Sequence, residues 1–479
     1  MSESAPANRL AFRLATNSLV QIVGSAIAAG ISFFTFVAMT RGLGPDAYGD
    51  YVAATSFLFL PVVLSDLGLA TTVLRDISAK PEVTESVMRR SLPLRALVSA
   101  AAVSVMVVAG LLMPFDDRTK VAVLIWSVGA YATLMNVAVL PVLQAQLRMH
   151  WAVLANVTGR GVSLALTLAA LSLDLGFSGV VWAQVLGVVV TFLVDLVVVN
   201  RMVSLRPVVD VGFWRELLRG SIVIGLATGL GQVFFKIDGV ILALVRPSFE
   251  VGLYGAAYKF LELADVVIAA IALSVFPTLT HFAATGNPRL REVVQRSFEA
   301  MLAVAIPLSI LMFAFAAPLI AVTAGAEFES AADALRILAP YPMLAIVNAL
   351  FWRVLIAAGA DRILLGIAGV VLTVNVALNV ALLPAYGFRA AAVTAVVSEL
   401  FSLSLAAVFM RRQMTFLPRL DYLPILALAT AGMVVVVVAL PGPPLLVATV
   451  ALAAYSAVVL AAPGTVRVGF GQVARALRP

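Results

Sequence analysis

The sequence contains no cysteine, two histidines and few charged residues. Without cysteine the chain cannot form disulfides, thiolate metal sites or cysteine nucleophiles. With His150 and His281 as the sole histidines, we predict no zinc or haem site and no bound cofactor. Lys, Arg, Asp and Glu make up 12% of the 479 residues, and soluble domains carry about twice that fraction. These shortages argue against a thiol-dependent enzyme and against a soluble protein.

Hydrophobic residues, in contrast, make up 62% of the chain, and its mean hydropathy is +1.07. Apolar stretches of about 20 residues recur, each long enough to cross a hydrocarbon core of roughly 30 Å as a helix. We therefore predict an all-α polytopic membrane protein with about 14 transmembrane helices. The expected helices cover residues 14–40, 49–74, 94–113, 120–146, 150–173, 178–200, 219–245, 251–280, 297–322, 335–358, 362–383, 388–410, 421–440 and 443–462.

Basic residues are concentrated in the tails and in the connectors that follow even-numbered helices. They include Arg75, Lys80, Arg89, Arg90, Arg95, Arg201, Arg206, Arg215, Arg219, Arg411 and Arg412. Because loops rich in Lys and Arg stay in the cytoplasm, we predict that both termini are cytoplasmic. The net charge of +7 then reflects membrane topology and indicates no nucleic-acid partner.

One of these connectors, residues 201–219, contains Phe213-Trp-Arg-Glu-Leu-Leu-Arg219. It has two interpretations: an amphipathic segment on the cytoplasmic surface that joins two groups of six helices, or an ordinary basic loop.

A short pattern occurs twice in the chain, at an offset of 203 residues. Residues 49–63 and 252–266 are identical at eight of fifteen positions without a gap. This offset fits a repeat of six helices, and an even number of helices makes the two copies parallel. The differences between the copies are informative, because the second copy has Lys259, Glu262 and Asp265 where the first has uncharged residues.

The repeat predicts two parallel six-helix lobes followed by a final helix pair. The N-lobe is expected at residues 1–205 and the C-lobe at residues 206–415. Residues 416–479 are expected to form two peripheral helices and a cytoplasmic tail. Such a duplication usually places a cavity between the lobes, which rock against each other to give alternating access.

Several ionisable residues fall at membrane depth in this assignment. They are Arg160, Lys236, Lys259, Arg353, Asp66, Asp195, Asp238, Glu262, Asp265 and Glu399. Each would cost roughly 2.5–3.5 kcal/mol if it faced lipid. Most of these side chains are therefore expected to face water or to pair. Asp195 and Arg353 lie near helix ends, where we expect their charged groups to reach the interface.

Two neighbouring helices carry the densest group of these charges. Lys259, Glu262 and Asp265 recur every three residues and form an oblique stripe on one helix. Lys236 and Asp238 lie on the preceding helix, too close in sequence to face each other. Two interpretations remain: a polar wall of a central cavity that binds substrate, and an interhelical salt-bridge network that only holds the helices together.

Three further residues are candidates for a gate or for ion coupling. Asp66 lies near the inner end of the second helix, and Arg75 is too far along to pair with it directly. Glu399 lies near the middle of the twelfth helix. Arg160, flanked by Gly159 and Gly161, either pairs with Glu399 in a close helix contact or binds a phosphate with several donors.

Specific motifs resemble one family. Arg41-Gly-Leu-Gly-Pro-Asp-Ala-Tyr-Gly-Asp-Tyr51 resembles the first connector of polysaccharide exporters of the multidrug/oligosaccharidyl-lipid/polysaccharide (MOP) superfamily. Asp66-Leu-Gly-Leu69 followed by Arg75 is similar to the end of their second helix. Asp238-Gly-Val-Ile-Leu and Glu250-Val-Gly-Leu-Tyr-Gly-Ala-Ala-Tyr-Lys259 look like their helix seven and eight signature. The resemblance covers essentially the whole chain.

The resemblance implies a Wzx-like flippase in the bacterial plasma (inner) membrane. Such proteins move a polyprenyl-pyrophosphate-linked oligosaccharide from the cytoplasmic to the outer leaflet, and their expected partners include polysaccharide polymerases and glycosyltransferases. The pyrophosphate would favour Arg160, Lys236 and Lys259. Acids in the cavity are candidates for coupling transport to protons or sodium.

Three alternatives to this function are open. A multidrug antiporter of the same superfamily would bind a cationic drug with Asp238, Glu262 and Asp265. A lipid II flippase is a second alternative, although the first helix lacks internal arginines. A membrane glycan polymerase or ligase would need a sizeable outer loop, which the expected topology lacks, so we predict that the protein is not an enzyme.

Overall fold

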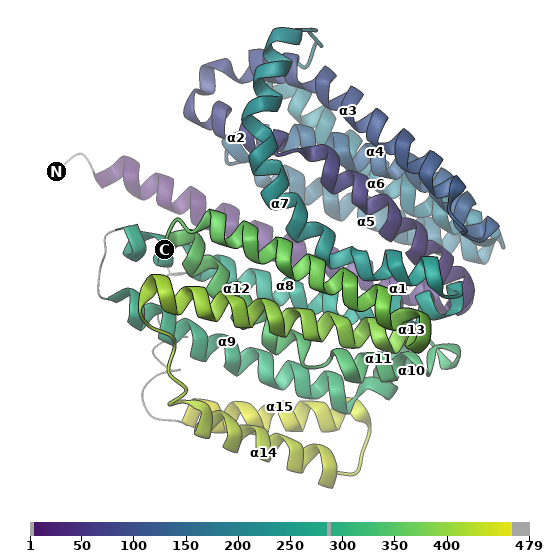
Figure 1. Cartoon of the computed structure of the whole chain (residues 1–479), viewed down its shortest axis with the longest axis vertical. Helices are drawn as coiled ribbons and strands as arrows, with labels where there is room; N and C mark the ends of the chain where they lie inside the picture. The colour runs from purple at the N-terminus through teal and green to yellow at the C-terminus, as the bar shows by residue number, and fades with distance from the viewer. Residues whose placement is uncertain (1–3, 285–288, 462–479) are drawn as a thin grey trace. The chain divides into compact units, whose positions relative to one another are not determined.

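The structure is a computed structural model that describes residues 4–284 and 289–461. The described elements are all helical (Figure 1). They are α1 Ser4–Asp66, α2 Leu69–Ala79, η1 Pro81–Val83, α3 Thr84–Leu112, α4 Asp117–Ala145, α5 Met149–Ser172, α6 Gly176–Met202, α7 Val211–Val245, α8 Ser248–Ala284, α9 Arg289–Ala314, α10 Ala316–Thr323, η2 Ala326–Phe328, α11 Ala331–Leu338, α12 Tyr341–Ala357, α13 Asp361–Met414, α14 Leu423–Ala439 and α15 Pro444–Ala461.

The predicted transmembrane segments coincide with these helices. Within the described residues, nine helical segments are long and apolar enough to cross a membrane. Two long elements each contain two predicted helices, because α1 is interrupted at Gly44 and α13 at Gly387. Gly44 has φ 73°, which glycine adopts without steric cost, and Pro45 then suits the first turn of the next helix. The prediction of an all-α polytopic fold is confirmed.

The start of α7 resolves the two interpretations of residues 201–219. The backbone is extended before Asp210, and the amphipathic part is simply the first turns of the continuous helix α7. The Asp210 side chain caps that helix by accepting a hydrogen bond from Phe213 N at 3.0 Å. Trp214 Nε1 donates to Arg90 O at 2.7 Å, and Leu217 is buried. This segment therefore packs on α3 and is not an independent surface helix.

The chain forms two compact units, Met1–Gly252 (unit 1) and Leu253–Pro479 (unit 2). Unit 1 contains α1 to α7 and the first turn of α8, so it extends beyond the N-lobe expected at residues 1–205. The expected lobes are defined by the internal repeat and the units by packing. The lobe boundaries stay a prediction.

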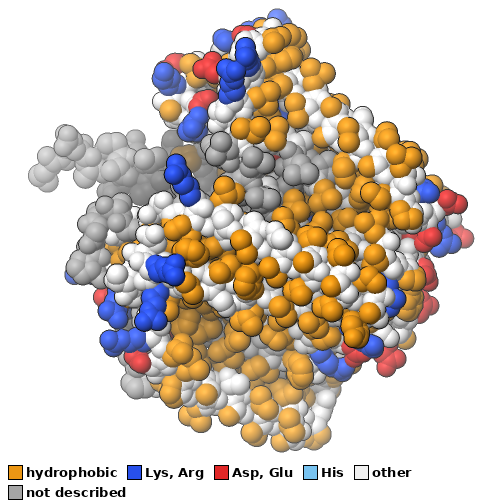
Figure 2. Space-filling model, viewed as in Figure 1, with side chains coloured by type: hydrophobic (Ala, Val, Ile, Leu, Met, Phe, Trp, Pro, Cys, Tyr) orange, Lys and Arg blue, Asp and Glu red, His pale blue; other side chains and the backbone are white. Residues whose placement is uncertain are grey.

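Unit 1 has a hydrophobic cluster toward each end of its helices. One cluster joins Leu69, Val73 and Ile77 of α2 with residues of α3, α4, α6 and α7. The other is built around Phe57 and Phe115, with residues of α3, α4, α6 and α7. In the view of Figure 2, hydrophobic side chains dominate the visible faces and charged groups lie mostly toward helix ends. This distribution suits helices whose middle portions contact lipid.

Between these clusters, the second membrane helix is broken after Asp66. Leu67 and Gly68 both have positive φ, 46° and 73°, and α2 starts immediately afterwards. A Cβ atom on Gly68 would lie 2.6 Å from both Ser221 O and Gly225 N of α7. A Cβ atom on Gly225 would overlap the backbone of Leu67. The break is therefore in direct backbone contact with α7.

The first residues of the two copies of the repeated pattern, Gly49 and Gly252, meet within unit 1. A Cβ atom on Gly49 would lie 2.9 Å from Gly252 N and would overlap Ser248 O. Conversely, a Cβ atom on Gly252 would lie 3.2 Å from Gly49 N and would overlap Pro45 O. The first residue of each copy thus packs against the other through backbone atoms.

Unit 2 is centred on α9, α12 and α13. The two halves of α13 are tied together by buried side chains: Asn375 Nδ2 donates to Ser398 Oγ at 3.2 Å, and Thr394 Oγ1 donates to Asn379 Oδ1 at 2.9 Å. Helices α14 and α15 lie side by side next to α9 (Figure 1). The expected position of this final helix pair at the edge of the protein stays a prediction.

The contact at Gly225 yields a stability prediction. Gly225→Ala should lower the free energy of unfolding by about 1–3 kcal/mol, because the added methyl group meets backbone that cannot rotate away. Gly220→Ala on the same helix is the matched control, since a Cβ atom there meets nothing within 4 Å. SDS titration in mixed micelles measures both. Equal stability of the two variants would contradict the proposed close contact.

Candidate functional site

The polar stripe on α8 lies in unit 2, and two of its members pair with each other. Lys259 Nζ donates to Glu262 Oε2 at 2.8 Å. The Lys259 side chain is 17% exposed and the Glu262 side chain 38%. The sequence left two interpretations of these charges: a wall of a central cavity that binds substrate, or an interhelical salt-bridge network. The structure adds an ion pair within a single helix, so part of the charge is neutralised on α8 itself.

Asp265, the third member of the stripe, belongs to a different group of side chains. It interacts electrostatically with Glu399 of α13 and with Tyr341 of α12. Glu399 is only 5% exposed. Asn348 Nδ2 donates to Glu399 Oε1 at 2.7 Å and to Ser402 Oγ at 2.9 Å. We call Asp265, Tyr341, Asn348, Glu399 and Ser402 the acidic cluster.

The chemistry of the acidic cluster follows from its two carboxylates. Two interacting carboxylates repel each other when both are ionised, and a proton or a monovalent cation on either one relieves the repulsion. The structure thus brings together Asp265, which was predicted to bind substrate, and Glu399, which was predicted to act in gating or coupling. Sequence reasoning missed Asn348, although an amide in an otherwise apolar helix is a usable signal.

Lys236 and Asp238 lie on α7 and therefore in unit 1. Asp238 is buried and Lys236 is half-buried. Both make interactions with neighbouring groups. The predicted wall thus draws its residues from two separately packed units, and a single continuous wall stays a prediction.

Arg160 is exposed on α5, and its Nη1 donates to Ser32 Oγ of α1 at 3.3 Å. Its neighbours differ: Gly159 packs closely on Thr191 of α6, whereas a Cβ atom on Gly161 meets nothing within 4 Å. The close helix contact expected here is therefore made by Gly159 and not by the arginine. An exposed guanidinium beside a hydroxyl can bind a phosphate with several donors.

Asp66 has a buried partner that the sequence analysis assigned to a connector. Arg95 Nη1 lies 2.6 Å from Asp66 Oδ1 and also donates to Asp66 O at 3.2 Å. The Arg95 side chain is 4% exposed and that of Asp66 24%. Arg95 Nε donates to Leu134 O of α4 at 3.4 Å. This ion pair fixes the backbone at the break in the second membrane helix.

Arg75 does not take part in this ion pair. Its side chain is 63% exposed and pairs with the adjacent Asp76 at 3.4 Å. Arg75 is therefore too far from Asp66 for direct pairing, as predicted. Arg95 was not predicted as the partner because the third helix was expected to start at residue 94, whereas α3 begins at Thr84 and buries Arg95 well inside.

Asp50 is a buried acid that was not among the predicted site residues. It is 3% exposed and accepts hydrogen bonds from Thr119 Oγ1 of α4 at 2.7 Å and from Ser248 Oγ of α8 at 2.6 Å. Ser248 also lies 3.3 Å from Asp116 Oδ2. Asp50 therefore links three helix ends next to the contact between Gly49 and Gly252.

The expectation for Asp195 was wrong. It was predicted to extend to the membrane interface, but it is 1% exposed. Instead its side chain lies beside Asn136 of α4. The packing of α4 on α6 covers this part of the helix, so the short side chain cannot reach water.

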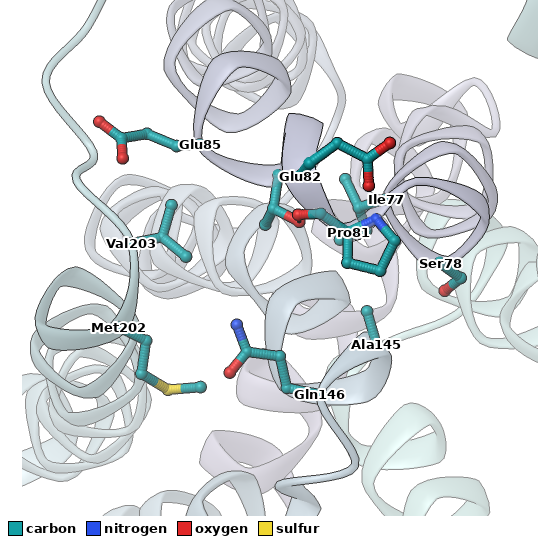
Figure 3. Close-up of a pocket in the computed structure, with 10 residues that line it drawn as sticks. Ile77, Ser78, Pro81, Glu82, Glu85, Ala145, Gln146, Met202 and Val203 are labelled. Atoms are coloured by element: carbon teal, nitrogen blue, oxygen red, sulfur yellow. The ribbon is translucent and has the colours of Figure 1, made fainter.

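A cavity of about 320 Å³ opens in unit 1 where α2, α3, α4 and α6 end or begin (Figure 3). The residues that line it include Ser78, Glu82, Glu85, Gln146, Met202 and Val203. None of the residues predicted to bind substrate or to act in gating is among its lining residues. We assign the cavity no role in the candidate site.

The chain matches known protein families over most of its length. Residues 14–283 match the family model described as "Polysaccharide biosynthesis protein", and residues 224–381 match the model described as "MatE". A relative described as the probable low-salt glycan biosynthesis flippase Agl15, from Haloferax volcanii, is 20% identical over 392 residues. This match covers 80% of the present chain and 81% of the relative.

Solved structures share the fold. The chain is similar to the lipid II flippase MurJ in an inward closed conformation, with a TM-score of 0.78, 12% identity, and coverage of 92% of this chain and 98% of that one. It is also similar to an inward-facing multidrug resistance MATE family transporter, with a TM-score of 0.67, 17% identity, and coverage of 81% and 94%. These similarities confirm the predicted MOP-like fold.

The ion pair of Asp66 with Arg95 leads to a prediction. Arg95→Gln should lower the free energy of unfolding by about 3–5 kcal/mol, because it leaves a partly buried carboxylate without its partner. Arg75→Gln removes an arginine only 20 residues away, and should change stability by less than about 0.5 kcal/mol, because its ion pair is exposed. SDS titration of both variants is the measurement. If both variants lost a similar amount of unfolding free energy, the buried ion pair would contribute no more to stability than the exposed one.

Proposed function

Because the chain belongs to the family of polysaccharide biosynthesis proteins, we propose that it is a lipid-linked oligosaccharide flippase. It moves a polyprenyl-pyrophosphate-linked oligosaccharide from the cytoplasmic to the outer leaflet by alternating access, and the glycan then enters a cell-surface polysaccharide. The observation that carries this proposal is the family match over residues 14–283. A curated relative described as a glycan biosynthesis flippase supports it.

The distribution of charge is consistent with such a substrate. The sugar headgroup needs a polar route, whereas the polyprenyl chain can stay in the hydrocarbon between helices. Arg160, Lys236 and Lys259 are the proposed ligands of the pyrophosphate, since cations and guanidinium forks match phosphate oxygens. Asp238 and Glu262 are proposed to accept hydrogen bonds from sugar hydroxyl groups.

The acidic cluster is the proposed coupling site. Asp265 and Glu399 interact electrostatically, so binding of a proton or sodium ion would change the balance of charge between α8 and α13. Asp66 and Arg75 are proposed to act near the cytoplasmic gate, where Asp66 fixes the helix break through Arg95. The protein carries out transport without covalent chemistry in this proposal, and no catalytic residues are assigned.

The proposed setting is the bacterial plasma (inner) membrane, with both termini in the cytoplasm. The concentration of Lys and Arg at one set of connectors supports this orientation. Glycosyltransferases that build the lipid-linked glycan, and polymerases that consume it, are the proposed partners.

A cation-coupled multidrug antiporter is the second candidate function. Two observations favour it: the match of residues 224–381 to the MatE model, and the presence of two interacting carboxylates in unit 2. A lipid II flippase shares the fold and differs in its glycan. All three functions require a multi-pass transporter and differ in what crosses the membrane.

Reconstitution separates these functions. We expect the purified chain in proteoliposomes to move a polyprenyl-pyrophosphate oligosaccharide across the bilayer, detected by its accessibility to an added glycosidase. Lys236→Ala should lower the rate at least about tenfold, the effect of losing roughly 1.4 kcal/mol of charge-assisted binding. Arg201→Ala, an exposed arginine at the end of α6, should leave the rate unchanged.

Other outcomes would support the alternatives. Efflux of a cationic dye without glycan movement would favour the antiporter, and selective movement of lipid II would favour the lipid II flippase. Wild-type rates in Lys236→Ala would remove this residue from the substrate site.

Cysteine accessibility tests the polar stripe directly, because the chain has no native cysteine. Glu262→Cys should react with a water-soluble methanethiosulfonate reagent in proteoliposomes, since the Glu262 side chain is partly exposed. Leu261→Cys should not react, because Leu261 is completely buried. A Glu262→Cys variant that stays unreactive with and without substrate would exclude a water-filled path along α8.

A further inference from the structure

Helix α7 is packed against other helices of unit 1 at three levels along its length. It contacts α1, α2 and α3. At its start, Trp214 Nε1 donates to Arg90 O at 2.7 Å, and the Arg90 guanidinium lies 5.5 Å from the centre of the Phe213 ring. The same guanidinium lies 3.4 Å from Asp210. One residue of α3 thus holds three side chains around the start of α7.

The middle of α7 is packed against the break in the second membrane helix. Gly225 approaches the backbone of Leu67 so closely that a side chain would overlap it, and Gly68 approaches Ser221 O and Gly225 N in the same way. Ser221 is completely buried. These contacts are between backbones, so no flexible side chain can rearrange to permit movement.

The far end of α7 is packed against the outer part of the second membrane helix. A Cβ atom on Gly239 would lie 3.0 Å from Ser56 Oγ and 3.4 Å from Ser56 Cβ. The next residue, Val240, is buried in the same hydrophobic cluster as Phe57 and Leu58. Sliding α7 by a single residue, a rise of about 1.5 Å, would replace glycine with a larger side chain at both the middle and the far contact.

From these contacts we infer that α7 moves together with α1 to α6 during transport. The moving boundary then lies after Gly252, because Ser248 and Gly252 are themselves packed against the backbone of α1, and not in the basic connector before α7 that separates the two copies of the repeat. This inference rests on the proposed transport function for its cycle of states. It predicts that α7 keeps its register on α1, α2 and α3 while the helices of unit 2 change position.

A disulfide between α7 and the second membrane helix tests this inference. The separation between Ser56 Cβ and a Cβ atom on Gly239, 3.4 Å, is close to the range of about 3.5–4.5 Å that disulfides need. In the double variant Ser56→Cys/Gly239→Cys, we expect the oxidised and the reduced protein to move the lipid-linked oligosaccharide at the same rate in proteoliposomes. A fall in rate on oxidation that reduction reverses would overturn the inference.

The two single-cysteine variants are the matched controls, since oxidation cannot cross-link them within one chain. If the unmodified chain moves no lipid-linked oligosaccharide, that result counts against the proposed function itself. The packing of α7 is then tested by spin-label distances.

Spin-label distances provide the second measurement, which does not depend on the activity of the double variant. Ile222 of α7 is paired with Leu97 of α3 in one sample and with Phe313 of α9 in another, and all three side chains are exposed. On adding a polyprenyl-pyrophosphate trisaccharide, we expect the distance from Ile222 to Leu97 to stay constant and the distance from Ile222 to Phe313 to shift. A shift in the first distance, or constancy of both, would overturn the inference.

Discussion

A charged group at membrane depth needs a partner that replaces its water, and much of the polar architecture of this protein follows from that requirement. Arg95 finds Asp66, Lys259 finds Glu262, and Glu399 is held by Asn348. Asp50 is satisfied differently, by two hydroxyl groups. These partners come from different helices in all but one case, so compensation of charge also determines which helices adjoin.

The same requirement explains where the helices can break. Non-helical backbone exposes polar groups that lipid cannot satisfy, so a break must be covered by protein. After Asp66 the break is covered by Gly225 of α7 and held by Arg95. Charge compensation and glycine packing therefore act at one place, and they make an otherwise costly interruption of a membrane helix stable.

The positions of the membrane helices were predictable because apolar length and Pro/Gly connectors are local signals. Even the interruptions at Gly44 and Gly387 fall where turns were expected between predicted helices. Helix starts were less accurate, since amphipathic first turns, as in α3 and α7, resemble basic loops. The third helix was expected to start at residue 94, whereas α3 starts at Thr84, and this error hid Arg95, a deeply buried partner in the candidate site.

The association of Asp265 with Glu399 could not be predicted from spacing, because they lie on distant segments and meet only after α8, α12 and α13 have packed. Likewise, the flanking glycines of Arg160 suggested burial, but only Gly159 lies at the helix contact. The residue types predicted which charged side chains need a partner inside the membrane. Which residue is that partner depends on tertiary packing, and no single segment of the sequence contains this information.

The reciprocal approach of Gly49 and Gly252 has a consequence for the history of the chain. The contact has the form of an isologous interface, in which a surface patch meets its own copy, as in a two-fold symmetric dimer. Here both copies belong to one polypeptide. A substitution at either glycine would disturb the backbone of the other copy, so the two duplicated segments are not free to diverge independently at this point. They differ in charge further along each helix, where Lys259, Glu262 and Asp265 replace Ser56, Phe59 and Val62.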